Sequence, residues 1–160
     1  MNTILKKKQL STDVYELCVQ SPRIARARKP GQFVIVQIDS DFGERIPLTI
    51  ADADAEAGTI TLVFQAVGAS THHLATKEVG QNIENVLGPL GNPTNIDNFG
   101  SVVCVGGGIG VAPLYPIAQA MKAAGNKLSV ILGARNKELI IFEDRMKKIA
   151  DNLIICTDDG

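Results

Sequence analysis

Side chains that bind transition metals are scarce in this sequence. Three cysteines and two histidines occur among 160 residues, and Cys18, Cys104 and Cys156 lie far apart along the chain. His72 and His73 are adjacent, and neighbouring residues of a helix point about 100° apart, so the two rings cannot bind one metal together. We therefore predict no metal site, and we expect buried, unpaired thiols in a reducing, cytoplasmic compartment.

Long apolar runs and a strong charge of either sign are also lacking. Sixteen Lys and Arg residues balance seventeen Asp and Glu residues, so no net field attracts a polyanion and nucleic acid is not an expected partner. No segment approaches the roughly 20 apolar residues of a membrane helix, and the first ten residues lack the apolar stretch of a signal peptide. The composition, 45% hydrophobic, predicts a globular protein with no membrane partner.

The sequence before residue 98 has the character of short strands separated by turns. Residues 13–20, 32–38 and 58–67 alternate apolar and polar side chains or are rich in β-branched ones, which indicates strands of a small antiparallel barrel or sandwich. Residues 70–78 predict one short helix with Ser70 or Thr71 as its cap. We take residues 1–97 as the first domain.

From residue 98 to residue 160 the pattern becomes strand, glycine turn, helix and strand. Alternating elements of this kind predict a parallel α/β sheet in a second domain, and the continuous apolar run Val102–Val105 predicts a strand buried on both faces. Gly125 follows the first helix, where glycine commonly ends one. The predicted elements are strands at 102–105, 128–132 and 153–156 and helices at 112–124 and 139–150.

The segment VVCVGGGIGVAPL carries the strongest chemical signal in the sequence. Glycines permit positive φ and close approach of a ligand, and the N–H groups at the start of the following helix favour phosphate. Pro113 is tolerated in the first helical turn, where a missing N–H costs nothing. A tight strand-to-helix turn without a ligand remains the alternative. The residues predicted to hold a nucleotide here are Gly107, Gly108, Ile109, Gly110 and Pro113.

The order G-x-G-x-x-P in this turn resembles the pyridine-nucleotide loop of the ferredoxin–NADP reductase superfamily. The resemblance continues through Gly133-Ala134-Arg135 and through the final Cys156–Gly160 segment. It implies that Arg135 and Asp158 lie beside bound NAD(H) or NADP(H). Arg135 suits a 2′-phosphate and the nearby Glu138 suits a free ribose hydroxyl, so the choice of nucleotide stays open, with NADH favoured by the resemblance.

Arg45-Ile46-Pro47-Leu48-Thr49 resembles the flavin-binding segment of the same superfamily, R-x-Y followed by Ser or Thr. Leu48 stands where the usual Tyr stacks on the ring, and the arginine comes one place early. By this resemblance Thr49 hydrogen-bonds near flavin N5 and is the catalytic candidate, while Leu48 and Phe64 supply apolar contacts. Taken alone, the segment also fits a bulged strand, and Gly68–Thr71 fits a plain capped helix. The other residues that the resemblance assigns to FAD are Arg45, Pro47, Val63, Gln65, Gly68, Ser70 and Thr71.

The resemblance covers nearly the whole chain and implies an antiparallel FAD-binding barrel followed by a partial Rossmann-like sheet with helices. The implied activity is flavin-dependent electron transfer from NAD(P)H to iron–sulfur centres, with a larger flavin and iron–sulfur oxidoreductase subunit as partner and ferredoxin as an indirect one. The branch it resembles holds the small subunit of NADH-dependent ferredoxin–NADP oxidoreductase and, as an alternative reading, the electron-transfer subunit of dihydroorotate dehydrogenase. A non-catalytic nucleotide-binding or docking module is a different alternative.

In that branch a cysteine group near the C-terminus holds a 2Fe–2S cluster, and no such cysteines occur before Gly160. We therefore expect a truncated chain, in which the cluster belongs only to the full-length protein. An incomplete sheet should expose an unpaired edge and tend to self-associate. Whether this chain retains FAD or activity alone is left open.

Overall fold

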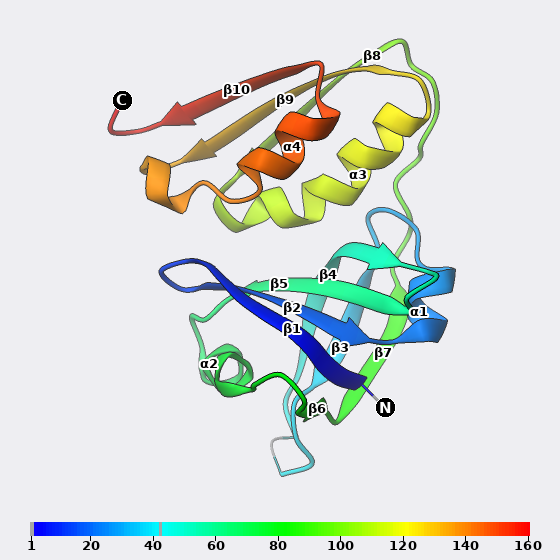
Figure 1. Cartoon of the computed structure of the whole chain (residues 1–160), viewed down its shortest axis with the longest axis vertical. Coiled ribbons are helices and arrows are strands. Elements are labelled where there is room, and N and C mark those ends of the chain that lie inside the picture. The colour runs from blue at the N-terminus through cyan, green and yellow to red at the C-terminus, as the bar shows by residue number, and fades with distance from the viewer. Residues whose placement is uncertain (1, 42) are drawn as a thin grey trace. The chain divides into compact units, whose positions relative to one another are not determined.

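The computed structural model of the chain describes residues 2–41 and 43–160, and Figure 1 shows its elements. The chain divides into two compact units, Met1–Pro93 and Thr94–Gly160, and each is described by itself. The division falls four residues before the boundary expected from the change of sequence pattern.

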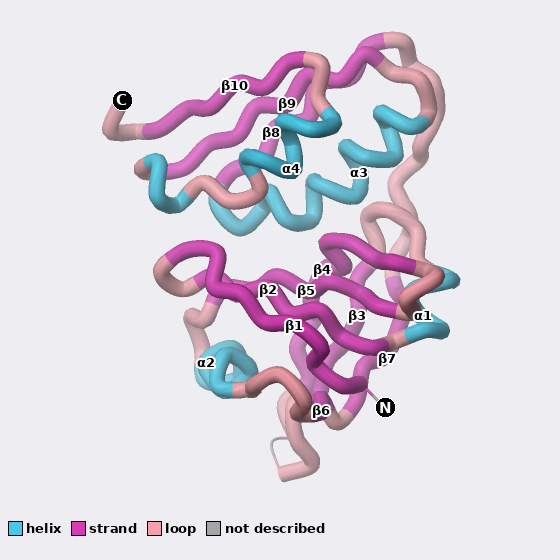
Figure 2. The backbone as a smooth tube through the Cα atoms, viewed as in Figure 1, coloured by secondary structure: helices cyan, strands magenta, loops and turns pink. Residues whose placement is uncertain are grey.

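The first unit is built on one antiparallel sheet with the strand order β6-β1-β2-β5-β4-β3-β7. Its edge strands β6 and β7 are consecutive along the chain and only Glu84 separates them, so the sheet curls into a nearly closed barrel (Figure 2). The predicted antiparallel barrel is confirmed. Its strands are β1 (Asn2–Ser11), β2 (Val14–Gln20), β3 (Phe33–Gln37), β4 (Arg45–Asp54), β5 (Thr59–Gln65), β6 (Asn82–Ile83) and β7 (Asn85–Leu90). Two short helices, α1 (Pro22–Ala27) and α2 (Ala69–Thr76), accompany them.

The barrel core follows from the alternation that predicted the strands. Leu17 of β2, Val34 and Val36 of β3, and Ile60 and Leu62 of β5 are all fully buried. Successive side chains of a strand point to opposite faces, so these residues turn inward while their neighbours face outward. The three strands predicted in this region are therefore confirmed, with bounds that differ by one or two residues.

Strand β1 was not predicted, because its sequence NTILKKKQLS is mostly polar. Ile4 is its one fully buried residue, and its central lysines pair through the backbone with β2. Helix α1 was also missed. It begins at Pro22, a position where proline is favoured, and it buries Ile24 and Ala25.

The second unit is a three-stranded parallel sheet with the order β10-β9-β8. Two helices follow the first two strands along the chain, and both lie on the same side of the sheet in Figures 1 and 2. The predicted partial parallel sheet is confirmed. Its elements are β8 (Ser101–Gly107), α3 (Val111–Ala123), β9 (Lys127–Ala134), α4 (Glu143–Ile149) and β10 (Asn152–Thr157).

Two expectations for this unit were wrong. The second helix begins at Glu143 instead of residue 139, because Lys137–Leu139 forms a separate 3₁₀ turn and Phe142 has a left-handed φ of 61°. The first strand is not buried on both faces: Val103 is 62% exposed and Val105 is 66% exposed. Helices α3 and α4 cover only one face of the sheet among the described residues.

The three cysteines differ from the expectation of buried thiols. Cys104 of β8 is buried, Cys18 of β2 is partly buried, and Cys156 of β10 is exposed. Burial raises the pKa of the Cys104 thiol, because a low-dielectric interior disfavours the thiolate. Within the described residues, no helix has both the length and the apolar character needed to span a membrane.

Candidate functional site

The glycine turn joins β8 to α3 through a single 3₁₀ turn, Gly108–Gly110. Gly108 has a φ of +53°, a conformation that glycine adopts without the strain other residues meet. The turn closes where the Val111 N–H donates to the carbonyls of Gly108 and Ile109. Pro113 is the third residue of α3, inside the first helical turn as predicted.

The glycines of this segment differ in the space around them. A Cβ on Gly106 would lie 2.8 Å from Leu114 Cδ2, the end of a flexible side chain, and 3.3 Å from Val111 Cα, so a side chain there would crowd α3 and displace Leu114. A Cβ on Gly107 would meet no atom closer than 3.8 Å, and one on Gly108 or Gly110 would meet nothing within 4 Å. Internal packing therefore explains Gly106, while the open space over the next glycines leaves their backbone free for a ligand.

The turn lies at the carboxyl edge of the parallel sheet. Gly107 is level with Gly133, and Thr157 is level with Ala134, at the ends of the three strands. Arg135 follows β9 directly and is exposed, and the Asp158 N–H donates to the Ala134 carbonyl at 3.2 Å. The structure thus brings the glycine turn, Arg135 and Asp158 to one edge, which is where open α/β sheets bind ligands.

In the barrel, strand β4 carries the segment that resembles a flavin-binding motif. Arg45, Pro47 and Thr49 alternate with buried positions and are exposed or half-exposed. Leu48 points the other way: it is 9% exposed and belongs to the core cluster. The side chains that β4 offers to a ligand are therefore the three outward ones.

Phe64 of β5 is likewise part of the core. It is 2% exposed and stacks on Tyr15 with ring centroids 5.9 Å apart. Both Leu48 and Phe64 belong to the barrel core, and the apolar flavin contacts expected from them stay a prediction. On the same strand Val63 is also buried, while Gln65 is exposed.

A groove that sequence reasoning missed runs over the outer face of β4, β3 and β7. Gln37 lies between Arg45 and Asn85 in the pairing of these strands, and the Asn85 side-chain amide donates to Gln37 Oε1 at 3.2 Å. The groove has a volume of about 280 Å³. The pairing of β3 with β4 and with β7 brings these residues together, so no local sequence signal marks the groove, although Arg45 itself was predicted. The groove is lined by Ile35, Gln37, Arg45, Asn85, Val86 and Leu87.

The start of α2 differs from the predicted cap. Gly68 occupies the N-cap position, and Ser70 and Thr71 lie inside the first turn. Thr71 Oγ1 accepts hydrogen bonds from the N–H groups of Val67 and Gly68, each at 3.0 Å, and donates to the Gly68 carbonyl at 3.1 Å. The Thr71 hydroxyl is therefore occupied in shaping the turn.

The Ser70 hydroxyl has a different status. Ser70 is 5% exposed, and its Oγ is the one fully buried side-chain oxygen or nitrogen atom without a hydrogen-bond partner in the described part of the chain. Buried polar groups nearly always have a partner. An orphaned hydroxyl in the first turn of a helix, next to backbone N–H groups, is compatible with a bound anionic group.

Comparison with known proteins agrees with this geometry. Residues 104–154 match the family of the oxidoreductase NAD-binding domain, which covers the glycine turn, α3 and β9. Together with the barrel, these features identify the chain as ferredoxin–NADP reductase-like.

The particular relatives lie in one branch. The chain is 47% identical, over its full length, to the dihydroorotate dehydrogenase B electron transfer subunit homolog of Thermotoga maritima. It is 31% identical, over 97% of its length, to the dihydroorotate dehydrogenase B electron transfer subunit of Bacillus cereus. It spans 56% and 61% of these relatives' own lengths.

Solved structures give the same picture. All of this chain superposes on 58% of a chain in the structure of NADH-dependent reduced ferredoxin–NADP oxidoreductase, with a TM-score of 0.94 and 45% identity. Phthalate dioxygenase reductase shares the fold, with a TM-score of 0.81 over 99% of this chain and 51% of its own, at 20% identity.

Proposed function

We propose that this chain is the FAD- and NAD(H)-binding part of an electron-transfer subunit in a larger oxidoreductase. The observation that carries the proposal is the open glycine turn at the carboxyl edge of the parallel sheet, where Gly107, Gly108 and Gly110 leave room for a ligand. It lies inside the segment that matches the NAD-binding domain family.

The barrel, residues 1–97, is the proposed FAD domain. The residues present fit FAD at two places: the start of α2, with the orphaned Ser70 hydroxyl, suits a diphosphate, and the outward face of β4 suits the ring. Thr49 is the proposed catalytic residue because its hydroxyl lies on that face. When bound, FAD would supply acceptance of two electrons as hydride from a reduced nicotinamide and their release one at a time to a separate acceptor.

The roles of the remaining barrel residues follow from their burial. Arg45 and Gln65 are exposed and offer charge and hydrogen bonds to the cofactor, while Pro47 gives an apolar surface. Thr71 holds the Gly68 turn in shape and does not itself donate to phosphate. Leu48, Val63 and Phe64 are buried, and their apolar contacts with the flavin stay a prediction.

Residues 98–160 are the proposed NAD(H)-binding domain. Gly107, Gly108, Ile109, Gly110 and Pro113 form its phosphate turn, while Arg135 and Asp158 border the site from the neighbouring strand ends. Ile109 is half-buried and contributes backbone to the turn.

The relatives' names point to the partners. One is the homolog of an electron transfer subunit of dihydroorotate dehydrogenase B, and another belongs to a ferredoxin–NADP oxidoreductase. We infer that the partner is a larger redox subunit. Its iron–sulfur centres would accept the electrons, and ferredoxin would exchange electrons with the complex through those centres. Both names combine a nicotinamide nucleotide with electron transfer, so the proposal stops at the NAD(H)-dependent half of the reaction.

The test is an anaerobic assay in which a reduced nucleotide is added to the purified chain loaded with FAD. Reduction of the flavin is measured as loss of its visible absorbance. NADH should reduce it faster than NADPH. Arg135→Glu should slow NADPH further and change the NADH rate less, because a carboxylate repels a 2′-phosphate. If the ratio of the two rates is unchanged, Arg135 does not border the nucleotide. A folded chain that holds FAD but is reduced by neither nucleotide would contradict the NAD(H) site.

A further inference from the structure

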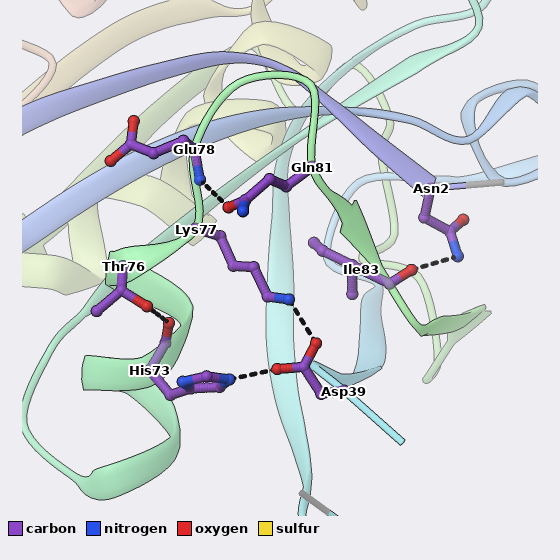
Figure 3. Close-up of polar contacts among 8 residues, drawn as sticks. All are labelled: Asn2, Asp39, His73, Thr76, Lys77, Glu78, Gln81 and Ile83. Atoms are coloured by element: carbon purple, nitrogen blue, oxygen red, sulfur yellow. Dashed lines mark hydrogen bonds and ion pairs between the residues drawn. The ribbon is translucent and has the colours of Figure 1, made fainter. Parts of the chain in front are cut away.

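A carboxylate outside the proposed cofactor contacts joins two segments of the barrel that are distant in sequence. Asp39 lies two residues after the end of β3, and it accepts hydrogen bonds from His73 Nε2 and Lys77 Nζ at the C-terminal half of α2 (Figure 3). These partners are 34 and 38 residues away along the chain. We call Asp39, His73 and Lys77 the α2 clamp.

The charges of Asp39 and Lys77 stabilise the contact between the segment after β3 and the end of α2. The hydrogen bonds from Lys77 and His73 hold the pKa of Asp39 below its ordinary value, so the carboxylate stays ionised at neutral pH. The Lys77 side chain is only 15% exposed, and its ammonium lies near the negative end of the α2 dipole, where a cation is favourable. The Asp39 side chain is 35% exposed, and it accepts two hydrogen bonds from potentially charged donors, each of which is stronger than a hydrogen bond between neutral groups.

Helix α2 needs such support because little else holds it. It has eight residues, fewer than the roughly 12–15 that a helix needs to be marginally stable alone. Leu74 is the one apolar side chain that it buries, beside Ser70. Lys7 of β1 adds a hydrogen bond to the Ala75 carbonyl at 2.8 Å. Polar contacts at the C-terminal end therefore decide much of where α2 lies.

The two segments joined by the α2 clamp carry the two parts of the proposed flavin site. The chain after Asp39 leads into β4, which presents Arg45, Pro47 and Thr49. Helix α2 begins with the Gly68 turn and the orphaned Ser70 hydroxyl. We propose that Asp39 is a positioning residue that sets the diphosphate-binding turn of α2 at a fixed place relative to β4. This inference rests on the proposed flavin site.

The experiment uses the 160-residue chain with Asp39→Asn, and measures two quantities. The first is the dissociation constant of FAD, followed by flavin fluorescence. The second is amide hydrogen exchange of residues 69–76 without FAD. We expect the FAD dissociation constant to rise about tenfold and α2 to exchange faster, since charged hydrogen bonds are the strong ones. Asp39→Glu, which keeps the charge, should restore most of the affinity.

The matched control is Glu78→Gln, which removes one negative charge near the same end of α2. Glu78 pairs with Lys7 at 2.8 Å, yet its side chain is 68% exposed, so the change in FAD affinity should stay below about twofold. A merely structural role for Asp39 would lower the melting temperature and leave the FAD affinity of the folded protein unchanged, and that result would overturn the inference. Should D39N fail to fold, Lys77→Met, which removes one of the two bonds, gives the same comparison.

The two measurements distinguish an error in this inference from an error in the proposed flavin site. If the folded wild-type chain binds no FAD, the flavin site is wrong, and hydrogen exchange still tests the clamp. Faster amide exchange in α2 of D39N would then support the role of Asp39 in holding α2 against the segment that follows β3. Unchanged exchange contradicts it.

Discussion

Ser70 and Thr71 are neighbours with opposite roles. The Thr71 hydroxyl makes three hydrogen bonds within the Gly68 turn, whereas the buried Ser70 hydroxyl makes none among the described residues. A hydroxyl buried without a partner costs about 1–3 kcal/mol, so Ser70 lowers the stability of the chain without ligand. Such a cost is understandable where the hydroxyl acts on a cofactor.

Substitution separates the two roles. Ser70→Ala should leave the ligand-free chain as stable as before or up to about 1 kcal/mol more stable, because it removes the orphaned hydroxyl. The same change should weaken FAD binding by about fivefold, the worth of one hydrogen bond. Thr71→Val, the control, should destabilise the ligand-free chain by about 1 kcal/mol, like the loss of a helix cap. Thermal melts and FAD titrations measure both; an S70A chain that binds FAD as tightly as wild type would remove Ser70 from the site.

A pH prediction concerns Asp151, whose carboxylate accepts from Lys122 Nζ at 2.7 Å on both oxygens and from the Leu128 N–H at 2.7 Å. These hydrogen bonds lower the pKa of Asp151, and the bond from Lys122 has the largest effect. The pKa in the folded state is below that in the unfolded state, so Asp151 stabilises the fold above about pH 4 and this contribution is lost as the pH falls further.

Acid unfolding followed by circular dichroism checks this prediction. The free energy of unfolding should fall steeply below about pH 4 in wild type, and less steeply in Asp151→Asn. Lys122→Met removes the partner and should flatten the profile in the same way. Identical profiles for all three proteins would show that this contact has no part in acid stability.

At the scale of the element, the glycines of the turn after β8 serve two purposes, helix packing at one position and ligand binding at another. A side chain on Gly106 would crowd Leu114 and the Val111 backbone, while Gly110 has room and an ordinary helical φ of −64°. A pattern of glycines does not reveal this difference, because both positions read alike in the sequence. The structure assigns one to the fold and leaves the other for the ligand.

Two alanine substitutions test the assignment. Gly106→Ala should destabilise the chain by about 1–3 kcal/mol through overpacking. Gly110→Ala should change stability by less than about 0.5 kcal/mol but weaken NADH binding roughly tenfold, because the new methyl group occupies the open side of the turn. Chemical denaturation and NADH titration measure the two effects. If G110A binds NADH normally, the turn is only a structural connection.

The sequence predicted strongly alternating strands and the glycine turn, since both depend on local pattern. It failed where tertiary packing decides. The motif around Leu48 does not reveal that the alternation of β4 turns this side chain inward, opposite Val34, and the ring contact itself stays a prediction. Helix α2 could begin at any of several small residues, and the hydrogen bonds of Thr71 place the cap at Gly68. The groove that includes Gln37 and Asn85 depends on a strand pairing that no local signal encodes.

At the scale of the whole molecule, the face of the parallel sheet opposite α3 and α4 is the conspicuous feature. Val103, Val105 and Ile154 are 62%, 66% and 51% exposed there. Contiguous exposed apolar side chains of this kind favour association. We therefore expect this face to be the contact surface when copies of the chain associate.

Self-association of the 160-residue chain should therefore depend on this face. We expect the average mass in sedimentation equilibrium to rise with concentration for wild type and much less for Val103→Thr with Val105→Thr, which keeps the β-branched shape. Val67→Thr, at a valine of the barrel unit that is 73% exposed, is the control and should behave as wild type. Association that is equal in all three proteins would place the contact elsewhere.

The central claim is that each unit holds its own dinucleotide, FAD in the barrel and NAD(H) at the glycine turn. Equilibrium titration of the purified chain with FAD, and then of the FAD-loaded chain with NAD⁺, which cannot reduce the flavin, tests it most directly. The account predicts about one FAD and about one NAD⁺ per chain at saturation, with S70A weakening only the first and G110A only the second. A well-folded chain that takes up neither dinucleotide, or two substitutions that weaken the same one, would contradict it.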